Sequence, residues 1–249
     1  MIYRKSPEEI EIMREGGRIL CDTLDLLEES LRPGVTTAEL DQIAEKSITG
    51  AGAEPSFKGY RGFPGSICAS PNNVIVHGIP GPLALRDGDI IALDVGVLWR
   101  GLHVDSAWTF PVGDISSEAL QLLKVTEASL DAALEECRPG NRLGDVGHAI
   151  EAVALAAGFS IVREYVGHGV GRALHEEPQI PNYGPPGRRQ LLTPGMTLAI
   201  EPMVNLGGEQ TKVLADAWTV ETLDGSLSAH FEHTVAITEE GHEVLTRRS

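Results

Sequence analysis

Cysteine and positive charge are both scarce in this chain of 249 residues. Its three cysteines, Cys21, Cys68 and Cys137, are widely spaced, which indicates neither a zinc ribbon nor a disulfide framework and favours a reducing compartment, the cytoplasm. Only 20 residues are Lys or Arg against 36 Asp or Glu, so the formal net charge is -16. This balance argues against autonomous nucleic-acid binding, which requires a basic surface. It suits metal cations and substrates that carry a protonated amine.

Long apolar runs and aromatic residues are also lacking. Charged residues are scattered through the first 17 residues, so this segment predicts neither a signal peptide nor a membrane span. Aromatic residues make up 5% of the chain, so a group of them near one site would be informative. The apolar fraction of 42% and the length allow one large globular domain, or two small ones, with a substantial core.

A helix is predicted close to the N-terminus. Ser6 can cap it, Pro7 suits its first turn, and Glu9 lies three residues after the cap, which is the pattern of a capping box. Apolar residues then recur at steps of three and four until Arg32-Pro33-Gly34, where the helix is expected to end.

The second half of the chain repeats the order of elements in the first half. After the first helix, a second helix begins at Thr36 or Thr37, and the segment Asp89 to Phe110 reads as two strands joined by a turn. Later, helix-forming sequence runs from Ser117 to Cys137, another helix ends near Gly158, and β-rich sequence follows. Each half therefore predicts two helices followed by strands.

Two landmarks recur at nearly the same offset. Arg138-Pro139-Gly140 lies 106 residues after the first Arg-Pro-Gly tripeptide, and Gly195 to Glu201 (GMTLAIE) lies 107 residues after Gly88 to Asp94 (GDIIALD). This indicates an internal duplication within a single catalytic domain, 1–249, whose halves are approximately 1–112 and 113–249. A chance match of two short motifs is the alternative.

Acidic residues occupy unusual positions at the ends of apolar strands. Asp94 and Glu201 end matching strands of the two halves, so a pseudo-twofold axis would point both at one central site. Asp105 lies eleven residues after Asp94, on the other strand of the predicted hairpin, where the two can become neighbours if the turn allows it. His168 lies between glycines that permit close backbone approach, and Glu232 falls in a strand-like run.

These four carboxylates and one imidazole form a hard ligand set that suits manganese, iron or cobalt better than a structural zinc. Two ions are favoured over one because four crowded carboxylates repel one another and two divalent cations neutralise their formal charge. In such sites the ions lie about 3.5–4 Å apart and lower the pKa of a shared water toward neutrality. A mononuclear iron oxygenase needs only two histidines and one acid, which leaves the other carboxylates unexplained.

Seven polar positions and their surroundings resemble one family of enzymes. They are His77 in VHGIP, Asp94 in ALDVG, Asp105 in DSAWTF, His168 and His175 in GHGVGRALHEEP, Glu201 in IEPM and Glu232 in FEHT. In this order they resemble the type I methionine aminopeptidases of the bacterial, minimal kind, from about Ser6 to Thr246. The resemblance implies an α+β pita-bread fold, with two pseudo-symmetric halves and a central antiparallel sheet covered by helices.

The resemblance also implies the activity and the metal ligands. The expected reaction is co-translational removal of the initiator methionine when the second residue is small, by attack of a metal-activated water on the first peptide bond. Asp94 would bind one of two divalent ions, His168 and Glu201 would bind the other, and Asp105 and Glu232 would bridge them. Cobalt, manganese and iron are the expected metals, and zinc can bind in their place.

Three residues receive catalytic roles from the same resemblance. Glu201 would shuttle a proton during the attack, His77 would hydrogen-bond the substrate near the scissile amide, and His175 would stabilise the tetrahedral oxyanion. His230 stands where the family more often has glutamine, which is expected to alter hydrogen bonding behind the metals.

The resemblance places the methionine side chain in a narrow apolar pocket. Besides His77 and His175, its predicted residues are Phe57, Tyr60, Phe63, Cys68, Leu174 and Trp218. Phe57 stands where some relatives have cysteine, and Leu174 replaces a more usual phenylalanine, so bulk is expected to be exchanged between the pocket walls.

Several alternatives stay open. An Xaa-Pro aminopeptidase or prolidase-like peptidase usually carries an additional N-terminal domain, whereas the first helix here begins near residue 6. A type II enzyme has a long insertion, for which the 26 residues from His175 to Glu201 leave no room. A non-catalytic peptide-binding protein on this scaffold normally loses metal ligands. The expected partners are nascent polypeptide N-termini and, transiently, the ribosome, with no membrane and a monomeric chain.

Overall fold

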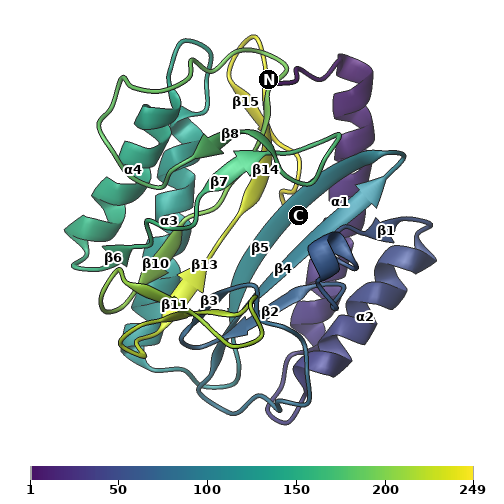
Figure 1. Cartoon of the computed structure of the whole chain (residues 1–249), viewed down its shortest axis with the longest axis vertical. Coiled ribbons are helices and arrows are strands. Elements are labelled where there is room, and N and C mark those ends of the chain that lie inside the picture. Colours follow the sequence, from purple (N-terminus) through teal and green to yellow (C-terminus); the bar gives the residue numbers. More distant parts are fainter. Residues whose placement is uncertain (1, 249) are drawn as a thin grey trace.

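The computed structural model describes residues 2–248, and Met1 and Ser249, the two ends of the predicted domain, lie outside the described residues. Two pairs of helices lie on opposite sides of the molecule, with the strands between them (Figure 1). The first pair is α1 (Pro7–Ser30) and α2 (Thr37–Gly50), and the second is α3 (Ser117–Glu136) and α4 (Leu143–Ala156). None of the helices in residues 2–248 combines the length and apolar composition that a bilayer crossing requires.

The first two helices begin at the predicted caps. The Ser6 hydroxyl accepts the Glu9 N–H at 3.3 Å, and the Glu9 carboxylate accepts the Ser6 N–H at 2.9 Å, so the predicted capping box is confirmed. Thr36 and Glu39 form a second capping box at the start of α2. The apolar residues of α1 lie on one buried face, which packs against the strands.

The predicted hairpin consists of β4 (Ile90–Trp99) and β5 (Leu102–Pro111). Arg100 and Gly101 form its two-residue turn with φ of 48° and 84°, and positive φ at both positions matches the twist of the paired strands. In the resulting register Gly96 pairs with Asp105 and Asp94 pairs with Ala107. Asp94 and Asp105 are therefore diagonal neighbours on one face of the hairpin.

The described strands form four antiparallel sheets. One sheet consists of β4 and its neighbours β5, β1 (Glu54–Pro55) and β2 (Cys68–Pro71). The five-stranded sheet has the order β15 (His242–Val244), β14 (His233–Ile237), β9 (Thr197–Ile200), β7 (Gly167–Gly169), β8 (Glu176–Ile180). The two three-stranded sheets are β13 (Ser228–His230), β10 (Met203–Asn205), β6 (Ser160–Ile161), and β11 (Thr211–Val213), β12 (Val220–Thr222), β3 (Val74–Val76).

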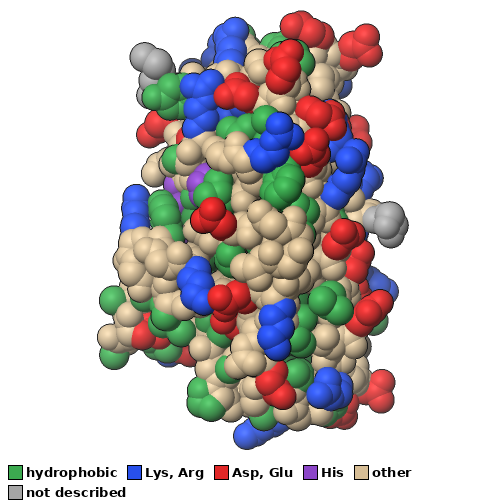
Figure 2. All heavy atoms as spheres, turned by 90° about the vertical axis from the view of Figure 1, so that its right-hand side faces the viewer, with side chains coloured by type: hydrophobic (Ala, Val, Ile, Leu, Met, Phe, Trp, Pro, Cys, Tyr) green, Lys and Arg blue, Asp and Glu red, His purple; other side chains and the backbone are tan. Residues whose placement is uncertain are grey.

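Each helix pair covers its own hydrophobic core. Residues such as Leu24, Leu40 and Val104 join α1 and α2 to the β4–β5 hairpin, and residues such as Leu130 and Leu198 join α3 and α4 to the five-stranded sheet. The two cores agree with two pseudo-symmetric halves, while their origin by internal duplication stays a prediction. On the face that carries α1 and α2, basic and acidic side chains are interspersed (Figure 2).

Candidate metal centre and substrate cavity

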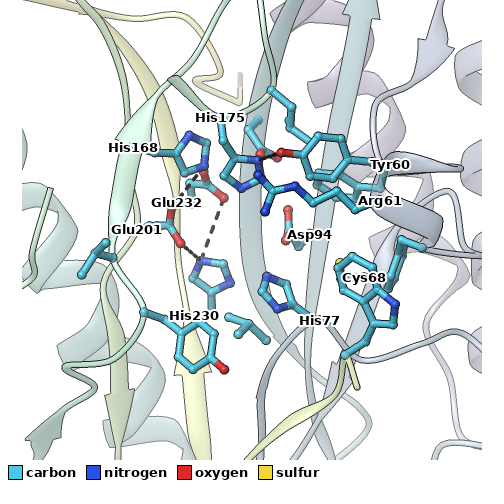
Figure 3. A pocket seen from close by; sticks show the side chains of 18 of the residues that line it. Tyr60, Arg61, Cys68, His77, Asp94, His168, His175, Glu201, His230 and Glu232 are labelled. Atoms are coloured by element: carbon cyan, nitrogen blue, oxygen red, sulfur yellow. Dashed lines mark hydrogen bonds and ion pairs between the residues drawn. The ribbon is translucent and has the colours of Figure 1, made fainter. Parts of the chain in front are cut away.

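A cavity of about 270 Å³ opens where the strands of the two halves face each other (Figure 3). All thirteen residues that the sequence predicts for the site line this cavity. They are Asp94, Asp105, His168, Glu201, Glu232, His77, His175, Phe57, Tyr60, Phe63, Cys68, Leu174 and Trp218. Their position in one cavity agrees with a common site, and the role assigned to each residue stays a prediction.

The five predicted ligands come from both halves. Asp94 and Asp105 project from the β4–β5 hairpin, and His168 lies in the middle of β7. Glu201 follows the last residue of β9, and Glu232 lies in the short connection between β13 and β14. No single element could assemble this set, because its members are spread over three strands, the end of a fourth and the connection between two others.

Hydrogen bonds between β5 and the segment around Glu232 hold the two halves together at the acidic side chains. The Glu232 N–H donates to the Ala107 carbonyl at 2.8 Å, and the Ser106 hydroxyl donates to the Glu232 carbonyl at 2.6 Å. Thr234 accepts the Asp105 N–H at 2.9 Å and donates to the Asp105 carbonyl at 2.7 Å. This buried seam fixes the backbones of Asp105 and Glu232 side by side.

The imidazole of His168 is oriented for metal binding. Its Nδ1 lies 2.9 Å from the Gly169 carbonyl, which can only accept, so Nδ1 carries the proton and Nε2 has a free lone pair. Nε2 lies 3.4 Å from a carboxylate oxygen of Glu201. Asp105, His168 and Glu232 each place a ligand atom within 4.8 Å of the others, a spacing that a single metal ion could span.

Burial and mutual repulsion perturb the four carboxyl groups. Burial raises the pKa of Asp94 to about 7. It also raises the pKa values of Asp105, Glu201 and Glu232 well above their usual range, and the charges of neighbouring carboxylates add to the effect. Buried oxygens of Asp94, Asp105 and Glu232 have no hydrogen-bond partner. Unpartnered, mutually repelling oxygens are the donor set that divalent cations satisfy, so these residues fit a metal centre.

Two further histidines, His77 and His175, line the same cavity as the four carboxylates. The Nδ1 of His175 lies 3.0 Å from the Tyr60 hydroxyl, and the two rings stack with centroids 5.3 Å apart. His77 follows β3 with a positive φ of 59°, and its ring packs edge-to-face against Tyr165 and Trp218. Desolvation lowers the pKa of His77 to about 4 and that of His175 to about 3, so both rings are neutral at pH 7.

The apolar wall of the cavity is a compact cluster of its own. Phe57, Phe63, Cys68 and Leu174 are buried together, with Tyr60, Ile79 and Trp218 packed against them. The rings of Phe63 and Trp218 meet edge-to-face with centroids 5.1 Å apart. Phe57 and Leu174, two of the three departures from the family pattern, lie in this same cluster, and the predicted exchange of bulk between the pocket walls stays a prediction.

Six other residues line the cavity without having been predicted as site residues. They are Arg61, Val76, Glu164, Tyr165, Val166 and His230. Arg61 and Val76 adjoin predicted residues in the sequence, which is the only sequence signal that could have indicated them. His230, expected behind the metals, is buried in the cavity wall with its unpartnered Nε2 3.8 Å from Glu201 and 3.9 Å from Glu232.

Comparison with known proteins assigns this arrangement to a family. Residues 11–239 match the model of metallopeptidase family M24. The chain is 58% identical over 247 residues to methionine aminopeptidase 1 of Bacillus subtilis, a match that covers 99% of this chain and 100% of that protein. The structure of methionine aminopeptidase from Rickettsia prowazekii has a TM-score of 0.98 and 40% identity, covering 99% of this chain and 100% of that one. The predicted pita-bread fold is confirmed.

The prolidase from Pyrococcus furiosus shares the fold alone. Its structure has a TM-score of 0.82 to this chain at 23% identity. The match covers 99% of this chain but 66% of the prolidase chain, so the prolidase is the longer protein, as the sequence comparison of the alternatives expects. The 58% identity to methionine aminopeptidase 1 of Bacillus subtilis, against 23% to this prolidase, does not favour a prolidase-like activity.

Proposed function

Because the chain belongs to metallopeptidase family M24, we propose that it is a hydrolase that removes the initiator methionine from nascent polypeptides whose second residue is small. One observation carries the proposal. Five ligand-type side chains, two neutral histidines and a cluster of apolar side chains all face a single cavity of about 270 Å³. The apolar cluster suits an unbranched thioether side chain, and the four carboxylates suit both metal cations and the substrate's protonated amine.

The proposed cofactors are two divalent ions, with cobalt, manganese or iron favoured and zinc able to replace them. Asp94 would hold one ion, His168 and Glu201 the other, and Asp105 and Glu232 would bridge both. When bound, such ions lower the pKa of a coordinated water to near 7 and polarise a carbonyl oxygen. Two divalent cations balance the four carboxylates of the cluster, which burial otherwise drives toward protonation.

The chain's own side chains then have distinct tasks. The Glu201 carboxylate takes a proton from the attacking water at one of its oxygens and returns it to the leaving amine, a role for which its buried position suits it. His77 hydrogen-bonds the substrate at the scissile amide, and His175 donates from Nε2 to the developing oxyanion. Tyr60 orients His175 through its hydroxyl, and the apolar wall excludes bulk water from the methionine side chain.

The same proposal covers partners and location. Every predicted site residue comes from one chain, so a monomer suffices for the reaction. The substrates are the N-termini of nascent chains, which places the enzyme in the cytoplasm with transient ribosome contact. The acidic net charge of -16 supports binding of protonated amines and opposes autonomous nucleic-acid binding.

The test uses metal-free protein with metal added back. Manganese, cobalt, iron(II) and zinc are titrated in separately, and cleavage of Met-Ala-Ser, Met-Lys-Ser and Ala-Pro-Ser is followed with metal analysis. We expect activity on Met-Ala-Ser to require metal and to exceed that on the other peptides. Equal turnover of Ala-Pro-Ser would favour an Xaa-Pro aminopeptidase or prolidase-like activity. Undiminished activity without metal would refute the metal-dependent mechanism.

A further inference from the structure

The segment before α1 crosses from the first half of the chain to the second. It runs from the first turn of α1 toward β8 and β15 (Figure 1). The Lys5 N–H donates to the Gly195 carbonyl at 2.7 Å, and Ile2 packs against the core that α3 and α4 cover. Residues 2–5 therefore belong, in packing terms, to the second half of the molecule.

Lys5 forms a buried ion pair there with Glu176, at a sequence separation of 171 residues. Its Nζ lies 2.6 Å from Glu176 Oε2, and the two side chains are only 1% and 4% exposed. In the other ion pairs that Lys or Arg forms within residues 2–248, the basic side chain is at least 18% exposed. Burial of both partners distinguishes this pair from the surface pairs.

Glu176 immediately follows His175 and closes the loop that carries it. The second oxygen of Glu176, Oε1, accepts the Ala173 N–H at 3.0 Å, so the carboxylate spans the turn on which Leu174 and His175 lie. Lys5 holds the other oxygen of the same carboxylate. The ion pair therefore fixes the group that shapes the His175 loop.

The alkyl stem of Lys5 also fills the space at the start of this loop. A Cβ on Gly171 would overlap Lys5 Cε, and Gly171 has a φ of 150°, so only glycine accommodates the lysine there. The neighbouring Arg172 stacks on the Tyr3 ring, 5.4 Å from its centroid, and its Nε donates to Glu9 at 3.0 Å. The loop thus rests on the N-terminal segment through Lys5 and Tyr3, and on the first turn of α1 through Glu9.

We propose that Lys5 is a positioning residue for His175 and acts through Glu176. This inference rests on the proposed function, in which His175 donates to the oxyanion. A buried ion pair is weak evidence for stability, because desolvation of both charges offsets their attraction. In this structure the pair of Lys5 and Glu176 holds the position of the His175 loop. An oxyanion donor needs its geometry fixed before the substrate binds.

The test compares Lys5→Met with a matched control, Arg14→Met, in the metal-loaded full chain. Arg14 also joins the N-terminal region to a distant segment, through Glu243 at 2.6 Å, but has no part in the loop. We expect Lys5→Met to lower kcat on Met-Ala-Ser by about 10-fold or more. KM should change by less than about 3-fold, and Arg14→Met should leave both constants unchanged.

A double-mutant cycle separates positioning from a general structural effect. In a His175→Ala background, Lys5→Met should lower kcat by less than about 2-fold, since the residue it positions is gone. An equal loss in both backgrounds, or no loss in the wild-type background, would overturn the proposal. If Lys5→Met does not fold, Lys5→Met/Glu176→Gln leaves no buried charge unpaired and is expected to show the same pattern.

A measurement without activity keeps the proposal distinct from the proposed function. Hydrogen exchange of residues 171–176 should be at least about 10-fold faster in the Lys5→Met/Glu176→Gln variant than in wild type, because the loop loses its anchor. Exchange in β4 and β5 should stay unchanged. Unaltered exchange in the loop would refute the positioning role even if the enzyme cleaves methionine, and faster exchange would support it even if it does not.

Discussion

Two buried groups of charges in this molecule are built on opposite principles. Around the cavity, Asp94, Asp105 and Glu232 present buried oxygens without partners, next to charges of the same sign. In the loop beside it, Lys5 and Glu176 are equally buried but have opposite charges and contact each other at 2.6 Å. The first group is incomplete without cations, and the second is neutral by itself. The comparison teaches that burial of charge alone does not identify a binding site, whereas burial of unbalanced charge does.

The largest effect is expected when one charge is removed from the acidic group, the cavity carboxylates Asp94, Asp105, Glu201 and Glu232, in the metal-loaded enzyme. Asp105→Asn keeps the shape of a proposed bridging ligand but removes its charge. Since loss of an outer partner of a ligand already costs about 10–100-fold, we expect loss of this ligand to lower kcat/KM by at least about 1,000-fold. Peptide assays and metal analysis check this, and the bound metal should fall below that of wild type.

The matched control for that variant is Asp224→Asn. Asp224 is exposed in a turn, where it accepts the Gly208 N–H at 2.7 Å, and it does not line the cavity. The Asp224→Asn variant should therefore retain wild-type activity. Full metal content together with full activity in Asp105→Asn would show that Asp105 does not bridge the ions.

Unbalancing the opposite-charge pair should change stability. Glu176→Gln leaves Lys5 as a buried charge without a counter-charge, which typically costs 3–5 kcal/mol. We expect about 3 kcal/mol, the lower end, because glutamine can still accept the Ala173 N–H. Urea unfolding at pH 7 measures this loss. The half-exposed pair of Arg14 and Glu243 gives the control, since Glu243→Gln should cost less than about 1 kcal/mol.

How far the sequence predicts these two groups differs for a physical reason. Asp94 and Glu201 each follow an apolar run, where an acid is unexpected, so both are visible without a structure. The prediction that both end their strands is correct for Glu201, which follows β9, and wrong for Asp94, which lies in the middle of β4 because the hairpin continues to Trp99. The diagonal placement of Asp94 and Asp105 depends on a two-residue turn at Arg100 and Gly101, which the sequence does not specify. The strand pattern and the first capping box follow from local periodicity and are confirmed.

Long-range packing accounts for what the sequence does not predict. Lys5 lies in a charged N-terminal stretch that reads as solvent-exposed, and nothing local indicates a partner 171 residues away. The seam between Ser106 and Glu232 likewise joins residues 126 apart, through a side-chain hydroxyl and a backbone carbonyl whose pairing no local sequence pattern indicates. In the sequence His230 is indicated only by a departure from the family pattern, and its place in the cavity wall comes from the pairing of β13 with β10.

The acidic group can be examined further through the pH dependence of the metal-free protein. The pKa of Asp94 is raised to about 7 in the folded chain, above its value of about 4 when unfolded, so the folded state binds more protons between these pH values. Stability from this group is therefore fully present below pH 4 and is lost as the pH rises through 7. We expect the contribution of Asp94 to the free energy of unfolding, measured as the difference between wild type and Asp94→Asn, to fall by about 2 kcal/mol between pH 5 and pH 7.5. The difference is needed because the buried neutral histidines His77, His175 and His230, whose pKa values are lowered, gain stability over this interval in both proteins.

Chemical unfolding of chelated protein across this range measures the effect, with the metal-loaded protein as control. Bound cations favour the ionised carboxylates, so the loaded enzyme should not lose stability over the same interval. In metal-free Asp105→Asn the fall should be smaller, because one repelling charge is absent. A stability difference between metal-free wild type and metal-free Asp94→Asn that instead grows in favour of wild type from pH 5 to pH 7.5 would contradict the description of the cavity as an unbalanced acidic cluster.

The smallest expected effect concerns His230. It lies beside the carboxylates of the acidic group but is neither one of the repelling charges nor a counter-charge to them. Its Nε2 is 3.8 Å from Glu201 and 3.9 Å from Glu232, too far for a hydrogen bond, and desolvation lowers its pKa to about 3, so it is a neutral neighbour of the carboxylates. His230→Gln restores the residue type more usual in the family and removes no existing contact of that nitrogen. We expect kcat/KM to change by less than about 10-fold, with metal content unchanged. A larger loss would mean that His230 holds Glu201 or Glu232 in place once the carboxylates are charged, and that the acidic group contains an internal partner after all.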